Sequence, residues 1–192
     1  DNTNKQWNRV PNTNDPLVAG VPYRLILRGN RSIDITDNST TPSDTRLSAT
    51  GTLSVGNVSQ TTGLSSTAGD FNFIGNPYQA QVDVNSLISG STNLSATQYY
   101  VWDPTLGGSP TPGTPGGRGA YVTVEASTGS NSVGSTANQY LQPMQGAFVV
   151  TGAGGTTPTV TFQESMKAVE QVQTDVKSLS TSEFINIQLF DA

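Results

Sequence analysis

The sequence predicts an all-β protein: an antiparallel β-sandwich, jelly-roll-like or immunoglobulin-like in general architecture, with long Gly/Pro-rich loops. Three observations predict it. Apolar and polar residues alternate with period 2 in several short segments, these segments are rich in β-branched and aromatic residues, and Gly, Pro, Asn or Asp bounds them. Many short strands separated by turn signals are typical of two packed antiparallel sheets. Only 12% of the 192 residues are charged, which excludes a coiled coil or a Glu/Lys-rich helical bundle.

The predicted strands follow one another along the chain. Residues 23–28 and 32–35 each alternate, and Gly29-Asn30 between them predicts a hairpin turn. In residues 47–55, apolar residues or glycine alternate with Ser and Thr, as in a half-buried strand. The further predicted strands are residues 71–74, 99–102, 120–125, 147–151, 159–163 and 184–190.

Two segments interrupt the strand pattern. Residues 107–119 are dominated by Gly and Pro, which predicts a long surface loop. In residues 164–179, apolar residues recur every three or four positions as on a helix, while the many Val, Thr and Ser residues favour an extended linker. Both alternatives stay open for this segment. A brief helix is also predicted at residues 84–88, with Asp83 as its N-cap.

These patterns divide the chain into two parts. Residues 1–163 are predicted to form the β-sandwich module. Residues 164–192 are predicted to be a linker, with a short helix as the alternative, followed by the first strand of a further segment.

Composition excludes several classes of function. The chain has no His and no Cys, so it has no thiolate chemistry, no Cys/His zinc site, no Ser-His-Asp triad and no disulfide. Nine basic residues against 14 acidic ones give a net charge of −5, which argues against a nucleic-acid partner. No apolar run is long enough to cross a membrane.

The acidic residues form no recognisable metal or catalytic motif. Asp34, Asp37 and the nearby Asp44 do not match the spacing of a calcium-binding loop, although a calcium ion held by loop carboxylates is the open alternative. Glycoside hydrolysis requires two carboxylates across a cleft, and no local motif brings two together. The glycines of residues 113–119 are not followed by a helical pattern, as a phosphate-binding loop would be. We therefore expect no enzyme activity, no cofactor and no metal.

Aromatic residues are the remaining candidates for ligand contact. Tyr100 and Trp102 share one face of the predicted strand at residues 99–102, and with Tyr121 they would form a platform on which sugars stack. The alternative is that large aromatics fill the core of the sandwich. Because every residue of this strand is bulky, we expect both of its faces to be covered and Trp102 to be buried. The two hypotheses are discriminated by whether Tyr100 and Trp102 are solvent-exposed and coplanar with a groove.

Several short motifs occur in order along the chain: VPYRLILRGNRS (21–32), LSATGTL (47–53), FNFIGNPY (71–78), YVWDP (100–104), LQPMQGAFV (141–149) and FQESMK (162–167). This ordered set resembles the β-rich region that precedes the C-terminal sorting domain in large surface proteins of Bacteroidetes, which the type IX secretion system exports. The resemblance covers about residues 7–167.

The resemblance implies a location and a role. It implies a non-catalytic structural, display or adhesion module of a secreted or cell-surface bacterial protein, located outside the cell or on its outer surface. The implied partners are the remainder of a longer parent chain, the type IX export machinery and neighbouring surface proteins. A lectin-like glycan-binding sandwich is the alternative function.

Overall fold

The computed structural model describes residues 1–12, 14–25, 30–34, 43, 50–103, 106, 119–168 and 171. Among these described residues, regular structure begins at Val58 and most of it is strand. The elements are β1 (Val58–Gln60), β2 (Phe71–Gly75), β3 (Gln81–Asp83), α1 (Val84–Ser89), β4 (Leu94–Asp103), β5 (Ala120–Glu125), β6 (Tyr140–Leu141), β7 (Gly146–Thr151), β8 (Val160–Phe162), a 3-10 turn η1 (Glu164–Met166) and β9 (Lys167–Ala168). The fold is all-β, as predicted.

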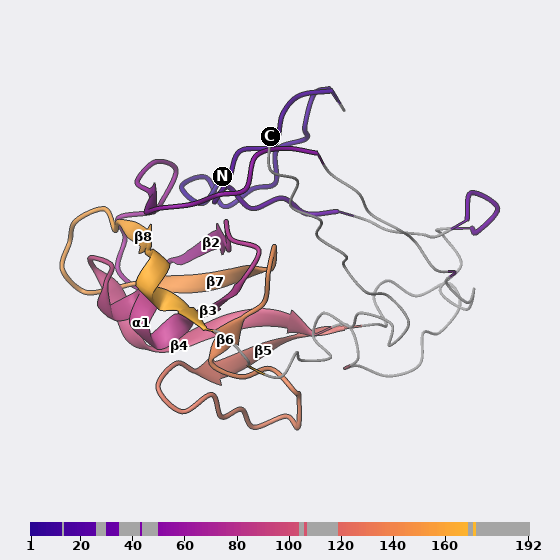
Figure 1. The fold of residues 1–192 in the computed structure, drawn as a ribbon. Helices are drawn as coiled ribbons and strands as arrows, with labels where there is room; N and C mark the ends of the chain where they lie inside the picture. Colours follow the sequence, from indigo (N-terminus) through magenta and orange to yellow (C-terminus); the bar gives the residue numbers. More distant parts are fainter. Residues whose placement is uncertain are drawn as a thin grey trace, which may run out of the picture.

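The strands form three antiparallel sheets. The largest has the order β2-β7-β4-β5, a second has the order β6-β3-β9, and β1 pairs with β8. Figure 1 shows the four-stranded sheet running from β2 to β5, with α1, β6 and β8 in front of it. The smaller sheets and the helix therefore form the second layer of a sandwich-like arrangement.

The core lies between these layers. Every second residue of the four-stranded sheet points inward, and β5 shows the pattern clearly, because Val122 and Val124 are buried while Tyr121, Thr123 and Glu125 are exposed. The second layer contributes buried side chains from α1, the two small sheets and η1. Its buried apolar members are Val82, Val84, Leu87, Ile88, Leu141, Val160, Phe162 and Met166.

Most of the predicted elements that fall on described residues are confirmed. The strands predicted at residues 71–74, 99–102, 120–125, 147–151 and 159–163 correspond to β2, β4, β5, β7 and β8. The helix at residues 84–88 is α1, and Asp83 caps it, accepting a hydrogen bond of 2.6 Å from the Ser86 backbone N–H. The two-residue strands β6 and β9 and the three-residue strands β1 and β3 were not predicted, because so few residues carry no detectable alternation.

Two strand predictions near the N-terminus are wrong for their described parts. Residues 50–55 form no ladder, and Leu53 and Val55 are exposed. Residues 23–25 and 30–34 are not strand either, since the Asn30 side chain and carbonyl accept bonds from the Ser32 and Ile33 backbone N–H groups and make a local turn. An alternating pattern becomes a strand only beside a partner, and no described residue pairs with these segments. The other parts of both predictions lie outside the described residues.

The segment that follows β8 is not helical over residues 164–168. After the 3-10 turn, Lys167 pairs with Val82 and adds β9 to the edge of β3. Met166 turns into the core, and Glu164 accepts hydrogen bonds from the Gly56 backbone N–H at 2.7 Å and from Lys167 at 2.6 Å. These contacts stabilise a turn rather than a helix, and the Lys167 ion pair lowers the pKa of Glu164. The predicted loop at 107–118 and strand at 184–190 lie outside the described residues.

Candidate functional site

The outer face of the four-stranded sheet carries a cluster of aromatic side chains. Its members lie on all four strands and point away from the core, and we call this surface the aromatic face: Phe71 and Phe73 on β2, Phe148 on β7, Tyr100 and Trp102 on β4, and Tyr121 on β5. Strand register aligns them, since Phe73 is opposite Phe148 and Phe148 is opposite Tyr100. Aromatic cross-strand pairs of this kind stabilise a sheet and hold the rings in place.

The rings of the aromatic face contact one another in a connected network. Trp102 and Tyr121 have ring centroids 5.0 Å apart at 74°, and Tyr121 lies 5.5 Å from Phe148 at 72°. Phe148 lies 4.8 Å from Phe73, and Phe71 lies 5.0 Å from Tyr100 at 75°. The Phe73 and Phe148 rings are tilted by 34°, whereas the other three pairs meet edge to face, which is favourable beyond the area that they bury. The aromatic face is therefore a rigid surface.

Two glycines make room for the rings. A Cβ at Gly119 would lie 2.3 Å from the Trp102 indole, and a Cβ at Gly146 would lie 2.7 Å from the Phe73 ring. Both distances are too short for a side chain, so the indole and the phenyl ring pack directly against backbone. Gly119 also has a φ of +80°, which disfavours other residues there.

The N-terminal segment covers part of the β2–β7 half of the aromatic face, around Phe73, and leaves Phe71 exposed. Trp7 packs against Phe73 with centroids 5.2 Å apart, and the Arg24 guanidinium lies 5.5 Å from the centre of the Trp7 ring. The Asn2 side chain accepts a bond of 2.8 Å from the Phe73 N–H and donates one of 3.4 Å to its carbonyl. Asn2 thereby satisfies backbone groups at the outer edge of β2, which are costly to leave unpaired.

The β4–β5 half is open to solvent. Trp102 is 42% exposed and Tyr121 is 50% exposed. Gln98, Thr123 and Glu125 lie on the same side of the two strands and are exposed as well. This half therefore combines exposed rings with amide, hydroxyl and carboxylate groups.

The three residues that the sequence singled out as a stacking platform, Tyr100, Trp102 and Tyr121, are all on this surface, and the competing prediction that Trp102 fills the core is wrong. Tyr100 is half-buried, and the Trp102 and Tyr121 rings meet at 74° rather than lying in one plane. Tyr99 and Val101 occupy the inner face of β4 instead. The described second layer packs on the inner face of the sheet. The size of the side chains on β4 therefore did not determine which of its faces is buried. Burial raises the pKa of Tyr99, whose hydroxyl donates to the Asn138 carbonyl.

Sequence reasoning missed Phe71, Phe73 and Phe148 as members of this surface. Their period-2 spacing was visible, but the intervening residues of β2 and β7 are partly apolar as well: Asn72 and Ile74 alternate with the two phenylalanines, and Ala147 and Val149 flank Phe148. A strand with apolar residues on both faces gives no sign of which face meets the second layer.

Trp102→Ala should lower the free energy of unfolding by only about 1–2 kcal/mol, because the indole is 42% exposed and keeps much of its contact with water after folding. Thermal unfolding should show a decrease of about 3–8 °C. Tyr99→Ala on the same strand is the matched control and should cost about 3–5 kcal/mol, since its ring is buried. Equal losses for the two variants would contradict the assignment of Trp102 to the surface.

Three of the described carboxylates are engaged in separate structural contacts. Asp83 caps α1, Asp103 accepts a hydrogen bond of 2.5 Å from the Ser135 hydroxyl, and Asp70 pairs with Lys5 at 2.8 Å. The hydrogen bond from Lys5 lowers the pKa of Asp70. Among the described residues there is no group of three or more acidic side chains that would hold a metal ion, and Asp37 and Asp44 fall outside that part of the chain.

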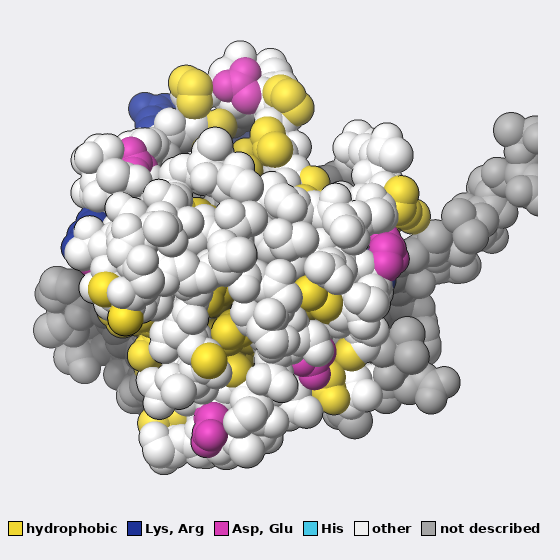
Figure 2. Space-filling model, turned by 90° about the vertical axis from the view of Figure 1, so that its left-hand side faces the viewer, with side chains coloured by type: hydrophobic (Ala, Val, Ile, Leu, Met, Phe, Trp, Pro, Cys, Tyr) yellow, Lys and Arg dark blue, Asp and Glu magenta, His cyan; other side chains and the backbone are white. Residues whose placement is uncertain are grey.

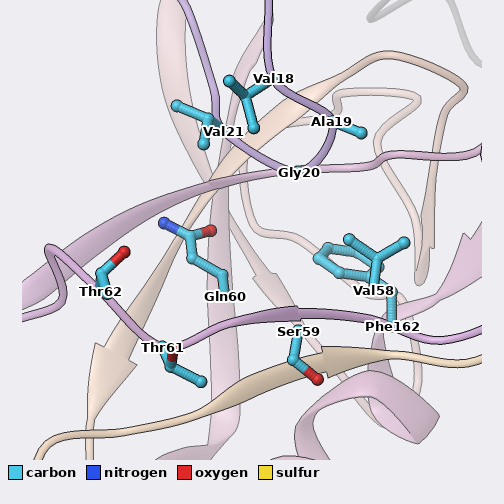
Figure 3. Close-up of a pocket in the computed structure, with 10 residues that line it drawn as sticks. All are labelled: Val18, Ala19, Gly20, Val21, Val58, Ser59, Gln60, Thr61, Thr62 and Phe162. Carbon is cyan, nitrogen blue, oxygen red and sulfur yellow. The ribbon is translucent and has the colours of Figure 1, made fainter.

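A cavity of about 170 Å³ lies between residues 18–21 and β1. Its walls include Val18, Val21, Val58 and Phe162, and Figure 3 shows the Gln60 amide pointing from β1 toward Val21. The Gln60 Oε1 atom is buried and accepts no hydrogen bond. A buried acceptor without a partner is a source of instability.

Gln60→Met should accordingly stabilise the protein by about 1 kcal/mol, because it replaces an unsatisfied acceptor by an apolar side chain of similar length. Gln142→Met is the matched control. Gln142 is buried too, but its amide accepts a hydrogen bond of 2.8 Å from the Gln81 side chain and donates one of 3.1 Å to the Tyr140 carbonyl. Replacing Gln142 should therefore destabilise the protein. Chemical denaturation of both variants measures the difference, and a loss of stability in Gln60→Met would contradict the interpretation.

Comparisons with protein-family models, with curated proteins and with solved structures found no match for this chain. Among the described residues, no helix is both long and apolar enough to span a membrane.

Proposed function

We propose that this chain is a non-catalytic display or adhesion module of a secreted or cell-surface bacterial protein, exported by type IX secretion, and that the aromatic face is its contact surface. The observation that carries the proposal is the exposure of Trp102 and Tyr121 on a rigid sheet. Contiguous exposed apolar surface is a mark of interaction sites, and Tyr and Trp are enriched in them.

The ordered motifs support a structural rather than a catalytic role. FNFIGNPY covers β2 and the turn after it, and the amide of Asn76 in this motif bonds to the carbonyls of Leu141 and Gln142 in LQPMQGAFV. The motif residues therefore hold turns and strands together. Asp70, Asp83 and Asp103 each contact a different structural partner instead of converging on a cleft, which also favours a module without catalysis.

The surface composition supports an extracellular location. Ser and Thr make up about a quarter of the chain, while charged residues are scarce. Figure 2 shows one face of the molecule on which acidic side chains are scattered singly among neutral ones. A neutral, hydroxyl-rich surface of this kind suits a module displayed outside the cell.

An antibody raised against this chain tests the location. It should label intact cells of the organism that makes the protein, and labelling should disappear in a strain that lacks the type IX translocon, with the protein retained inside. An antigen found inside wild-type cells, and never on their surface or in the medium, would refute the proposal.

Beads coated with the protein test the contact surface. They should attach to surfaces coated with matrix protein or polysaccharide, and the triple variant Phe71→Ser/Trp102→Ser/Tyr121→Ser should abolish attachment. Val133→Ser is the matched control, since Val133 is an exposed apolar residue outside the aromatic face. Attachment that the triple variant leaves unchanged would show that the aromatic face is not the contact surface.

A further inference from the structure

We infer that the β4–β5 half of the aromatic face binds an uncharged polysaccharide, with pyranose rings stacked on Trp102 and Tyr121. This inference rests on the proposed adhesion function and names the chemical class of its partner. Ring geometry, the neighbouring polar groups and the charge of the surface carry it.

The two exposed rings are fixed in place before any ligand arrives. Trp102 and Tyr121 are directly opposite in the β4–β5 register, and their rings meet edge to face at 5.0 Å. The indole rests against the Gly119 backbone, and the tyrosine ring is held from its other side by Phe148. Rings held in this way lose little conformational entropy on binding. The axial C–H groups of a pyranose offer an apolar patch that packs against such rings.

Polar groups continue directly from the rings along the same two strands. The next two cross-strand pairs on this face are Tyr100 with Thr123 and Gln98 with Glu125. Successive pairs on one face lie about 6.8 Å apart, so the three pairs extend over roughly 14 Å. Hydroxyl, amide and carboxylate groups donate to and accept from sugar hydroxyls, whose hydrogen bonds go in both directions. We call these three cross-strand pairs the strip, and its length and polar groups suit a short run of linked sugar rings.

The charge of the strip indicates which class of polymer it would bind. Its six described residues, namely Gln98, Tyr100, Trp102, Tyr121, Thr123 and Glu125, include one carboxylate and no Lys or Arg. An anionic polysaccharide or a nucleic acid would require cations at this surface. An uncharged chain is complementary to it.

A protein partner fits this half less well. A protein interface is most apolar at its centre, with polar groups at its rim. On this surface the continuous apolar part is the β2–β7 half, where Trp7 packs on Phe73 and Phe71 stays exposed, whereas the β4–β5 half places polar groups beside its rings. A protein interface would therefore centre on the β2–β7 half rather than on the β4–β5 half. The observations therefore favour a polysaccharide.

Affinity electrophoresis tests the inference with native gels that contain hydroxyethylcellulose, galactomannan, a soluble β-1,3-glucan or dextran. At least one of these neutral polymers should retard the wild-type protein, while alginate should not. Trp102→Ala/Tyr121→Ala should weaken the affinity by about tenfold or more, as truncation of aromatic contact residues does. Val133→Ala should bind like the wild type. Circular dichroism and thermal unfolding establish that both variants are folded.

The possible outcomes separate the inference from the proposed function. Retardation by none of the four neutral polymers, or undiminished retardation of the double variant, overturns glycan binding at this strip. If bead attachment to matrix protein still depends on the aromatic face in that case, the adhesion proposal survives and its partner is a protein. If attachment is also independent of the aromatic face, both proposals fail.

Discussion

Asn76→Asp should lower the free energy of unfolding by about 3–5 kcal/mol, which is a large fraction of the total for a domain of this size. The Asn76 side chain is buried between the turn after β2 and the segment that joins β6 to β7. Its Nδ2 group donates to the carbonyls of Ala80 at 2.8 Å, Gln142 at 3.0 Å and Leu141 at 3.2 Å. A carboxylate has no proton to donate and would face these carbonyl oxygens with a negative charge.

Urea denaturation at neutral pH measures this loss. The difference between variant and wild type should shrink in acid, because protonation of the new carboxyl group restores a donor and removes the buried charge. Asn57→Asp is the matched control, since Asn57 is exposed, and its effect should stay within about 0.5 kcal/mol. A variant at position 76 as stable as the wild type would mean that the amide does not hold the two segments together.

Phe162→Ala should have a similar effect, with a loss of about 3–5 kcal/mol. The ring of Phe162 is fully buried at the end of β8 and meets the ring of Tyr78 edge to face, with centroids 6.3 Å apart. Truncation would leave a void beside Tyr78 and remove the largest buried side chain of β8. The melting temperature should fall by about 10 °C.

Phe71→Ala provides the matched comparison, because it removes the same atoms from a ring that is 51% exposed. It should cost about 1 kcal/mol. Differential scanning calorimetry of the two variants separates core from surface phenylalanine. A loss at Phe71 as large as that at Phe162 would show that the aromatic face is buried in the folded protein.

Sequence pattern predicted well the part of the fold in which neighbouring strands reinforce one another. The strands β2, β4, β5 and β7 are long enough to display alternation, and the cap at Asp83 is a local signal that requires no tertiary contact. The pattern failed at residues 50–55, where alternation is present but no described strand lies alongside. Pairing is a property of two segments, and one segment cannot reveal it.

The candidate site could be predicted only in part, and the reason is related. Tyr100 and Trp102 were placed on one face of a strand because side chains alternate, and that placement is confirmed. Which face meets the second layer depends on where α1 and the small sheets lie, and this is absent from the local sequence of β4. The prediction that Trp102 is buried was based on residue size, whereas the arrangement of the two layers determines which face of β4 is buried.

The chain has two tryptophans, and both lie on the outer side of the same sheet, Trp7 over its β2–β7 half and Trp102 on its β4–β5 half. Each is more than one-third exposed, so neither indole reports on the interior. The tryptophan fluorescence of the native protein therefore comes from the outer side of this sheet alone. A Trp7→Phe variant would leave the emission of Trp102 as an optical probe of the β4–β5 half. That emission would respond to a ligand bound at this half and would be insensitive to the packing of the core.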